Sequence, residues 1–190
     1  MAHVNNDSER FEALFNQHHS AILAYVLRRC QTPEEAADVV AETFTTTWRR
    51  LDDVPTGERT LPWLYATAKH TLANTRRSAA RRDALTERAT HELAVAIDAQ
   101  SESSLEYAPG RTISDAARAA LLSLNEGERE VLLLCAWEGL KPREIGRVLG
   151  VGSVTARTRL HRARAKFAAA LSPIPPVSQM APVTPQEDSR

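Results

Sequence analysis

The chain has 190 residues, 43% of them hydrophobic, and its 24 lysines and arginines balance its 24 aspartates and glutamates. This length fits one medium domain or two small ones. No stretch approaches the roughly 18 apolar residues of a membrane-spanning helix, and the first residues lack the parts of a secretory signal. We therefore expect a cytoplasmic protein without membrane insertion. A net charge of zero argues against nucleic-acid binding, although a sum can hide opposed blocks.

Apolar residues recur at helical spacing and no segment alternates as a strand does, which predicts an all-α protein. A first domain, residues 8–82, is expected to contain three helices, the first from Ser8 to Arg29. Thr32 is expected to cap the second helix, with Pro33 in its first turn and Glu35 completing a capping box. The third helix should run from about residue 60 to residue 82. The inward side of the second helix is expected to carry Ala36, Val40, Phe44, Trp48 and Leu51.

Residues 83–112 are read as a flexible acidic linker, because 83–108 hold six acidic residues against Arg88 alone, although residues 85–97 could hold a helical turn or two. A second small helical domain is expected over residues 113–171. Asn125 and Glu128 predict a capping box there, and Gly139 a helix stop. A short helix over 142–149, a glycine turn at 150–152 and a last helix over 153–171 complete it. Residues 172–190 contain five prolines and are expected to form a disordered tail.

The sequence offers little chemistry for an enzyme. Cys30 and Cys135 lie far apart, without a CxxC partner, and are interpreted as small buried hydrophobic residues. The histidines are dispersed, and neither a zinc-binding spacing nor a glycine-rich phosphate loop is present. We therefore expect no catalytic residue, no metal and no cofactor.

The last two helices have the outline of a helix-turn-helix, whose second helix enters the DNA major groove. Residues 141–168 carry eight positive side chains against Glu144 alone. Arg157, Thr158, His161 and Arg162 fall outside the apolar stripe of the last helix and can face a groove. The alternative is an amphipathic helix with a solvated basic side, but the preceding short helix and turn favour DNA.

Two further surfaces stand out in the first domain. The third helix carries five positive residues between positions 69 and 82 and no acidic one, interleaved with Trp63 and Tyr65. Cations beside aromatic rings suit single-stranded or melted nucleic acid, and the alternative is that both aromatics are core residues. On the second helix, Asp38, Glu42 and Thr46 form an acidic and polar stripe at four-residue steps, which by itself is ordinary solvated surface.

Four stretches in this order resemble the extracytoplasmic-function sigma factors, a two-domain group of the bacterial sigma-70 family. They are FEALFNQHHSAILAYVLRR, EEAADVVAETFTTTWRRL, LPWLYATAKHTLANTRRSAARR and LNEGEREVLLLCAWEGLKPREIGRVLGVGSVTARTRLHRARAKF. The resemblance implies a sigma region 2 helical bundle joined by the linker to a sigma region 4 helix-turn-helix. It also implies a dissociable promoter-recognition subunit, expected to serve a stress or envelope response.

The resemblance further implies partners and site residues. The partners are core RNA polymerase, through the β′ clamp coiled coil and the β subunit, promoter DNA, and an anti-sigma factor. The polymerase-binding residues are Asp38, Val39, Glu42, Thr43, Thr46 and Arg49. The residues that read and melt the minus-ten element are Trp63, Lys69, His70, Asn74, Arg76 and Arg77, with the loop 55–60 walling a base pocket. Those that read the minus-thirty-five element are Thr155, Arg157, Thr158, Arg159, His161 and Arg162.

Two other hypotheses remain at this point. A stand-alone helix-turn-helix regulator, with a first domain that senses a ligand or dimerises, needs only the features of the second domain. An interaction module whose basic helices are merely surface needs neither DNA nor polymerase. Promoter-specific transcription with core polymerase distinguishes the sigma factor from both.

Overall fold

The computed structural model describes residues 2–90 and 114–171, with side chains described for 6–81 and 114–171. The regular elements of this part of the chain are all helical, as predicted. They are α1 (Ala2–Leu27), α2 (Pro33–Arg49), α3 (Thr60–Thr90), α4 (Asp115–Leu122), α5 (Glu126–Ala136), α6 (Pro142–Leu149) and α7 (Ser153–Leu171). Two 3-10 turns, Leu51–Asp53 and Gly57–Arg59, connect α2 to α3.

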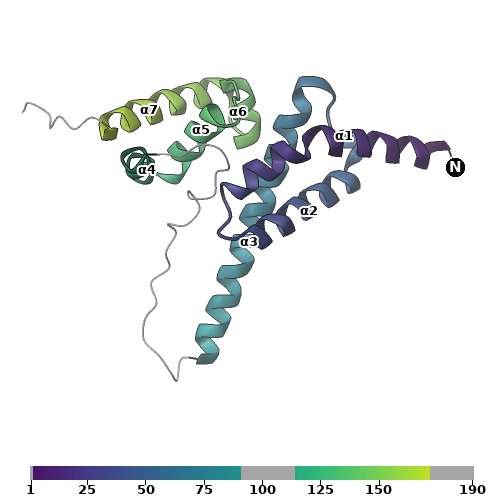
Figure 1. Ribbon diagram of the computed structural model, residues 1–190, viewed down its shortest axis with the longest axis horizontal. Coiled ribbons are helices and arrows are strands. Elements are labelled where there is room, and N and C mark those ends of the chain that lie inside the picture. The colour runs from purple at the N-terminus through teal and green to yellow at the C-terminus, as the bar shows by residue number, and fades with distance from the viewer. Residues whose placement is uncertain (1, 91–113, 172–190) are drawn as a thin grey trace, which may run out of the picture.

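Helices α1, α2 and α3 pack together as an N-terminal unit (Figure 1). Its core is closed by fully buried side chains such as Ile22, Tyr25 and Leu64. The prediction that Trp48 points inward is wrong, since 44% of this residue is exposed. Its ring packs edge-on against Phe11, with centroids 5.1 Å apart, and so lies at the rim of the α1–α2 pair.

The helix boundaries follow local capping chemistry. The Thr32 hydroxyl accepts a hydrogen bond from the Glu35 backbone N–H at 3.1 Å, as predicted. The Glu35 carboxylate accepts from the backbone N–H of Gln31, at 2.9 Å, one residue before the expected donor. Helix α1 begins six residues earlier than predicted. Helix α3 continues to Thr90, through residues expected to belong to the linker, because that stretch is rich in helix-forming residues.

The remaining linker residues up to 112, the predicted domain start at 113 and the proline-rich tail at 172–190 lie outside the described residues. The four helices α4 to α7 form a C-terminal unit, in which α7 packs against the other three. Asn125 and Glu128 form the predicted capping box at the start of α5. Arg129 donates side-chain hydrogen bonds to the carbonyls of Leu121, Leu122 and Leu124 and so closes the C-terminal end of α4.

The turn between α6 and α7 is tight. Gly150 ends α6 in a left-handed conformation, with φ of 66°. The Val151 N–H donates to the Gly146 carbonyl at 2.8 Å, and a Cβ added to Gly146 would lie 2.7 Å from the Val151 carbonyl oxygen. The sequence predicts the turn but does not reveal the need for glycine at position 146.

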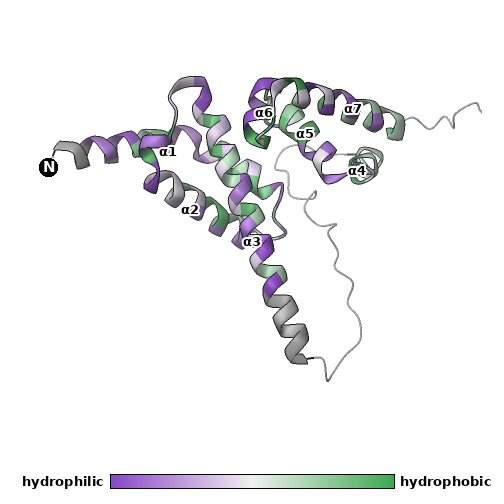
Figure 2. Ribbon diagram, turned by 180° about the vertical axis from the view of Figure 1, so that it is seen from behind, coloured by the Kyte–Doolittle hydropathy of each residue, from purple (hydrophilic) through white to green (hydrophobic). Residues whose placement is uncertain are grey.

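The C-terminal unit lies against the N-terminal unit, with α6 packed on α3 (Figure 1). Along the helices, apolar residues alternate with polar ones, as expected of amphipathic helices around a core (Figure 2). Within 2–90 and 114–171, no helix is both long and apolar enough to cross a bilayer.

Candidate nucleic-acid interface

A groove of about 1050 Å³ lies on the surface between the packed helices α2 and α3 and brings two predicted surfaces together. Its α2 side includes Asp38, Glu42 and Thr46, and its α3 side includes His70 and Asn74. Sequence reasoning assigned these residues to two different tasks. The structure shows that the acidic stripe and the basic helix face each other across one groove.

The outer side of α2 remains polar and open. Asp38 and Glu42 are exposed, and Glu42 is 3.9 Å from Arg49 and accepts a hydrogen bond from the Thr46 hydroxyl at 3.5 Å. Val39 and Thr43, also predicted to bind a partner, are buried, with exposures of 1% and 0%. The Thr43 hydroxyl donates to the Val39 carbonyl at 2.7 Å, inside the helix's core side. These two residues therefore hold the helix in the bundle and do not form its outer surface.

Helix α3 divides its predicted nucleic-acid residues between two sides. Trp63, His70, Asn74 and Arg77 fall on one side by helical periodicity, whereas Lys69 and Arg76 fall on another. The four members of the first side lie on or beside the groove. Arg77 donates to the Asn74 side-chain oxygen at 2.6 Å, and the Arg50 guanidinium lies 5.8 Å from the centre of the half-buried Trp63 ring.

Arg76 is occupied elsewhere. Its guanidinium donates to the backbone carbonyl of Arg29 at 2.7 Å and lies 3.8 Å from the Glu126 carboxylate of the C-terminal unit. Lys69 is half-buried on the same side of α3. Tyr65 is buried at 3% exposure and packs against Tyr25 with ring centroids 5.0 Å apart, so it is a core residue.

The loop at 55–60 leads directly into α3. The Thr60 hydroxyl donates to the Pro55 carbonyl at 2.6 Å, and Gly57 has a positive φ of 67°. This loop borders a cavity of about 510 Å³, which is lined by Thr56, Glu58 and Arg59 on one side and by polar residues of α6 and its N-terminal cap on the other. The predicted base-pocket wall therefore lies next to the first helix of the helix-turn-helix.

The residues of α7 that were predicted to contact the minus-thirty-five element lie on its solvent-exposed surface. The six residues are all exposed: Thr155, Arg157, Thr158, Arg159, His161 and Arg162. Within the described part of the chain, the three arginines and the histidine make no side-chain hydrogen bond or ion pair, so their donors are free to meet an anionic ligand. The buried stripe behind them consists of Ala156, Leu160 and Ala163.

Other cations of α7 turn back toward α5. Lys166 is hydrogen-bonded to the Glu128 carboxylate, which lowers the pKa of that carboxyl. Arg164 donates to the Cys135 sulfur at 3.2 Å. Cys135 is only half-buried and faces this arginine, so the prediction of two buried cysteines holds for Cys30 alone. The block of eight positive residues therefore contains two that support the fold.

Sequence reasoning missed Val154, which is 71% exposed in the first turn of α7. The signal was present, because an apolar residue there has no place in the buried stripe. Among the described residues, no group of three or more potential ligands gathers as a metal site would require.

Comparison with known proteins gives consistent matches to both units. The family model of sigma-70 region 2 matches residues 14–82, and that of sigma-70 region 4 matches residues 114–167. RNA polymerase sigma factor YlaC of Bacillus subtilis is 32% identical over 157 residues, which cover 82% of this chain and 88% of the relative. RNA polymerase sigma factor CarQ of Myxococcus xanthus is 29% identical over 160 residues, covering 84% and 87%.

Solved structures agree on the fold. The sigma factor RpoE in complex with the anti-sigma factor NepR from Bartonella quintana matches with a TM-score of 0.56 and 21% identity, over 85% of this chain and 96% of that one. CnrH in complex with the cytosolic domain of CnrY matches with a TM-score of 0.53 and 27% identity, over 85% and 86%.

Proposed function

Because the chain belongs to the RNA polymerase sigma factors of the sigma-70 family, in the extracytoplasmic-function group, we propose a task for each of its surfaces. As a member of this family it is a sigma subunit that directs transcription initiation, with core RNA polymerase and promoter DNA as partners. We assign it no catalytic step of its own, and the cytoplasm as its place of action, since its polymerase works there.

The outer side of α2 is the proposed polymerase-docking surface. Asp38, Glu42 and Arg49 supply exposed charges along one side of the helix, and the half-buried Thr46 adds a hydroxyl group. In the family this helix docks on the β′ clamp coiled coil, with further contacts to the β subunit. Charges at such a surface set specificity and the association rate more than raw affinity.

The groove side of α3 is the proposed minus-ten surface. It combines His70, Asn74 and Arg77 with the Trp63 ring near its start, which suits stacked bases and phosphates of a melted strand. Asn74 is proposed to hydrogen-bond a flipped base, with the loop 55–60 as one wall of the pocket. We propose that Lys69 contacts a phosphate. Arg76 is proposed to have a structural role between the two units.

The exposed side of α7 is the proposed minus-thirty-five surface. Its guanidinium groups can bind guanine edges or phosphates bidentately, and Thr158 and His161 add shorter polar contacts. We add Val154 to this set, because residues in the first turn of a recognition helix meet base edges and an exposed valine suits a thymine methyl group.

One observation carries the proposal: two exposed reading faces occupy separate helical units, each matched by its own sigma-70 region. A stand-alone helix-turn-helix regulator leaves the match to region 2 unexplained. One of the structural neighbours is a sigma factor in complex with an anti-sigma factor, and we propose that an inhibitor of this class also controls this chain.

Reconstitution with core RNA polymerase and genomic promoter fragments tests the function. We expect promoter-specific transcripts that disappear without the chain. Arg162→Gln should reduce transcription from promoters with a minus-thirty-five element, whereas Arg164→Gln, with the same charge change at an arginine that is bonded to Cys135 of α5, should have much less effect. Failure to bind core polymerase at all, or equal losses in the two variants, would contradict the assignment.

A further inference from the structure

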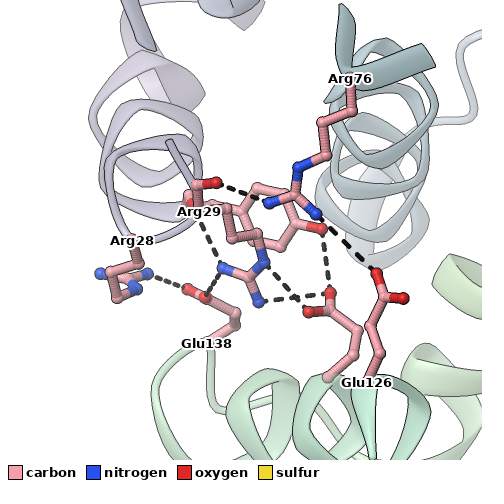
Figure 3. A network of polar contacts seen from close by, with 7 residues as sticks. Arg28, Arg29, Arg76, Glu126 and Glu138 are labelled. Atoms are coloured by element: carbon pink, nitrogen blue, oxygen red, sulfur yellow. Dashed lines mark hydrogen bonds and ion pairs between the residues drawn. The ribbon is translucent and has the colours of Figure 1, made fainter. Parts of the chain in front are cut away.

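A cluster of seven polar residues joins the two units, and we call it the clamp (Figure 3). The N-terminal unit contributes Tyr25, Arg28, Arg29 and Arg76, and the C-terminal unit contributes Glu126, Glu130 and Glu138. We propose that the clamp holds the free protein in a closed state that competes with polymerase binding, an inference that rests on the proposed function. The two arginines that follow α1 therefore pair with this chain's own C-terminal unit.

The geometry of the clamp is that of a built interface. Arg29 Nε donates to one Glu130 oxygen at 3.1 Å, and Arg29 Nη1 lies 3.4 Å from Glu138. The Tyr25 hydroxyl donates to Glu130 at 3.0 Å, and Arg28 pairs with the other oxygen of Glu138 while its guanidinium lies 5.4 Å from the Trp137 ring centre. Both carboxylates therefore have at least two donors from the opposite unit.

Burial distinguishes the centre of the clamp from an incidental surface contact. The side chains of Arg29 and Glu138 are only 8% and 3% exposed, whereas Glu126 at the edge is 91% exposed. Exposed ion pairs contribute little, but removing one partner of a buried pair leaves an uncompensated charge and is strongly unfavourable. The closed state should therefore depend on Glu130 and Glu138 and hardly at all on Glu126.

The same chemistry makes the closed state reversible. Taking several charges out of water costs about as much as their pairing returns, so an interface of this kind is not strongly bound. The buried Arg28 Nε makes no hydrogen bond within the described residues, which adds an unfavourable contribution that hydration removes on opening. Polar contacts between units of one chain are typical of interfaces that separate.

The closed state is incompatible with the extended arrangement that a promoter requires. Elements centred near minus ten and minus thirty-five are about 25 base pairs apart, roughly 85 Å along DNA at about 3.4 Å per base pair. In the structure, α6 packs on α3 and shares a cavity with the loop at 55–60. Units in direct contact have centres separated by about one small-domain diameter, roughly 30 Å. The clamp must therefore open before both reading surfaces meet their elements.

The double variant Glu130→Gln/Glu138→Gln removes both buried carboxylate charges and preserves side-chain shape. Distances between spin labels at Glu12→Cys and Ala169→Cys, with both native cysteines changed to alanine, report the separation of the units in the full chain. We expect a narrow distribution in the parent and a longer, broader one in the double variant. Arg28→Gln, from the opposite unit, should give an intermediate result, and Glu126→Gln should match the parent. Far-ultraviolet circular dichroism checks that each variant retains its helices.

Affinity for core polymerase provides the second measurement. If the closed state holds about 90% of the molecules, opening it should tighten the apparent Kd about tenfold. Unchanged distances in the double variant would overturn the closed state, and longer distances with unchanged affinity would overturn the competition. If neither parent nor variants bind core polymerase, the proposed function fails, and the distances alone still decide whether the clamp closes the free protein.

Discussion

Asn74 is the single side chain on which the proposed promoter-opening role depends most. It is exposed in the α2/α3 groove, and its oxygen is held by Arg77 at 2.6 Å, which leaves its amide N–H groups to face a base. We expect Asn74→Ala to slow promoter opening about five- to tenfold, the effect of one lost hydrogen bond, with little change in polymerase affinity.

Permanganate reactivity of melted thymines measures opening, and binding to core polymerase is measured separately. Ser78→Ala, one helical turn further along the same groove, is the matched control and should behave as the parent does. Equal losses of opening and polymerase binding in Asn74→Ala would show that the residue supports the fold or the docking surface instead.

The two cysteines should differ sharply in reactivity. Burial, reinforced by the nearby Glu35 carboxylate, raises the pKa of the Cys30 thiol to about 12, so at pH 8 only about one molecule in ten thousand carries the reactive thiolate. Cys135 is half-buried beside Arg164. We expect Ellman's reagent to modify no more than one thiol in the native protein and both in urea. Rapid modification of both under native conditions would contradict the buried environment of Cys30.

For individual residues, the sequence predicts which surface a side chain lies on better than it predicts the contacts of that side chain. It identifies the exposed arginines of α7 from their place outside an apolar stripe. It cannot show that Arg76 donates to the Arg29 carbonyl, because that bond depends on how α1 and α3 pack. Val39 and Thr43 were assigned to a partner surface by resemblance, although their spacing with Val40, Phe44 and Thr47 already places them on the buried side.

At the scale of elements, the α6–α7 turn should be the most sensitive point of the helix-turn-helix. A methyl group at Gly146 would meet the Val151 carbonyl oxygen at 2.7 Å, a contact that only a backbone shift can relieve. We expect Gly146→Ala to reduce the free energy of unfolding by about 1–3 kcal/mol, as overpacking does. It should also reduce minus-thirty-five-dependent transcription, because the start of α7 moves.

Gly152→Ala is the control within the same turn. Its added methyl group would have no neighbour within 4 Å, and the backbone there needs no left-handed conformation. This substitution should be neutral or slightly stabilising, by about 0.4–1 kcal/mol, through the lower entropy of the unfolded chain. Urea unfolding of the two variants gives the comparison, and similar losses in both would refute the steric argument.

Helix starts were predictable because capping residues act locally. Thr32, Pro33, Asn125 and Glu128 lie at the predicted cap positions, and only the donor to Glu35 differs. The C-terminal ends of the helices were less predictable. Helix α3 runs on to Thr90, since acidic residues interspersed with alanine and leucine are as compatible with a helix as with a solvated linker.

At the scale of the whole molecule, some of the balanced positive and negative charges pair with each other between the two units. The sequence pattern alone could not predict this pairing. The sequence separates two basic blocks from acidic segments, and the structure shows that acidic residues in α5 and just after it meet two arginines that follow α1 and one arginine of α3. The partners of Arg28 and Arg29 are more than a hundred residues away in the chain, and Glu126 is 50 residues from Arg76. No local period links them, so their pairing depends on how two already folded units dock.

The junction of the two units also predicts how stability responds to alkaline pH. Burial raises the pKa of Tyr65 to about 12 and that of Tyr25 further above its usual range, and the carboxylates of Glu138 and Glu130 add to these shifts. Both phenols remain protonated in the folded chain when they would ionise in the unfolded chain. The two protonated tyrosines therefore contribute fully to the free energy of unfolding below pH 10. This contribution is lost as the pH rises above 10, by about 1.4 kcal/mol per pH unit for each tyrosine.

Urea unfolding between pH 8 and 11 measures this loss. Tyr25→Phe removes one of the two ionisable groups, so its free energy of unfolding should fall less steeply with pH than that of the parent, even if the variant is less stable at pH 8. A lower starting stability alone would shift the curve without changing its slope, because only a titrating group alters the number of protons bound on unfolding. Parallel pH profiles for the parent and Tyr25→Phe would mean that Tyr25 ionises at its ordinary pKa and is not buried against Glu130.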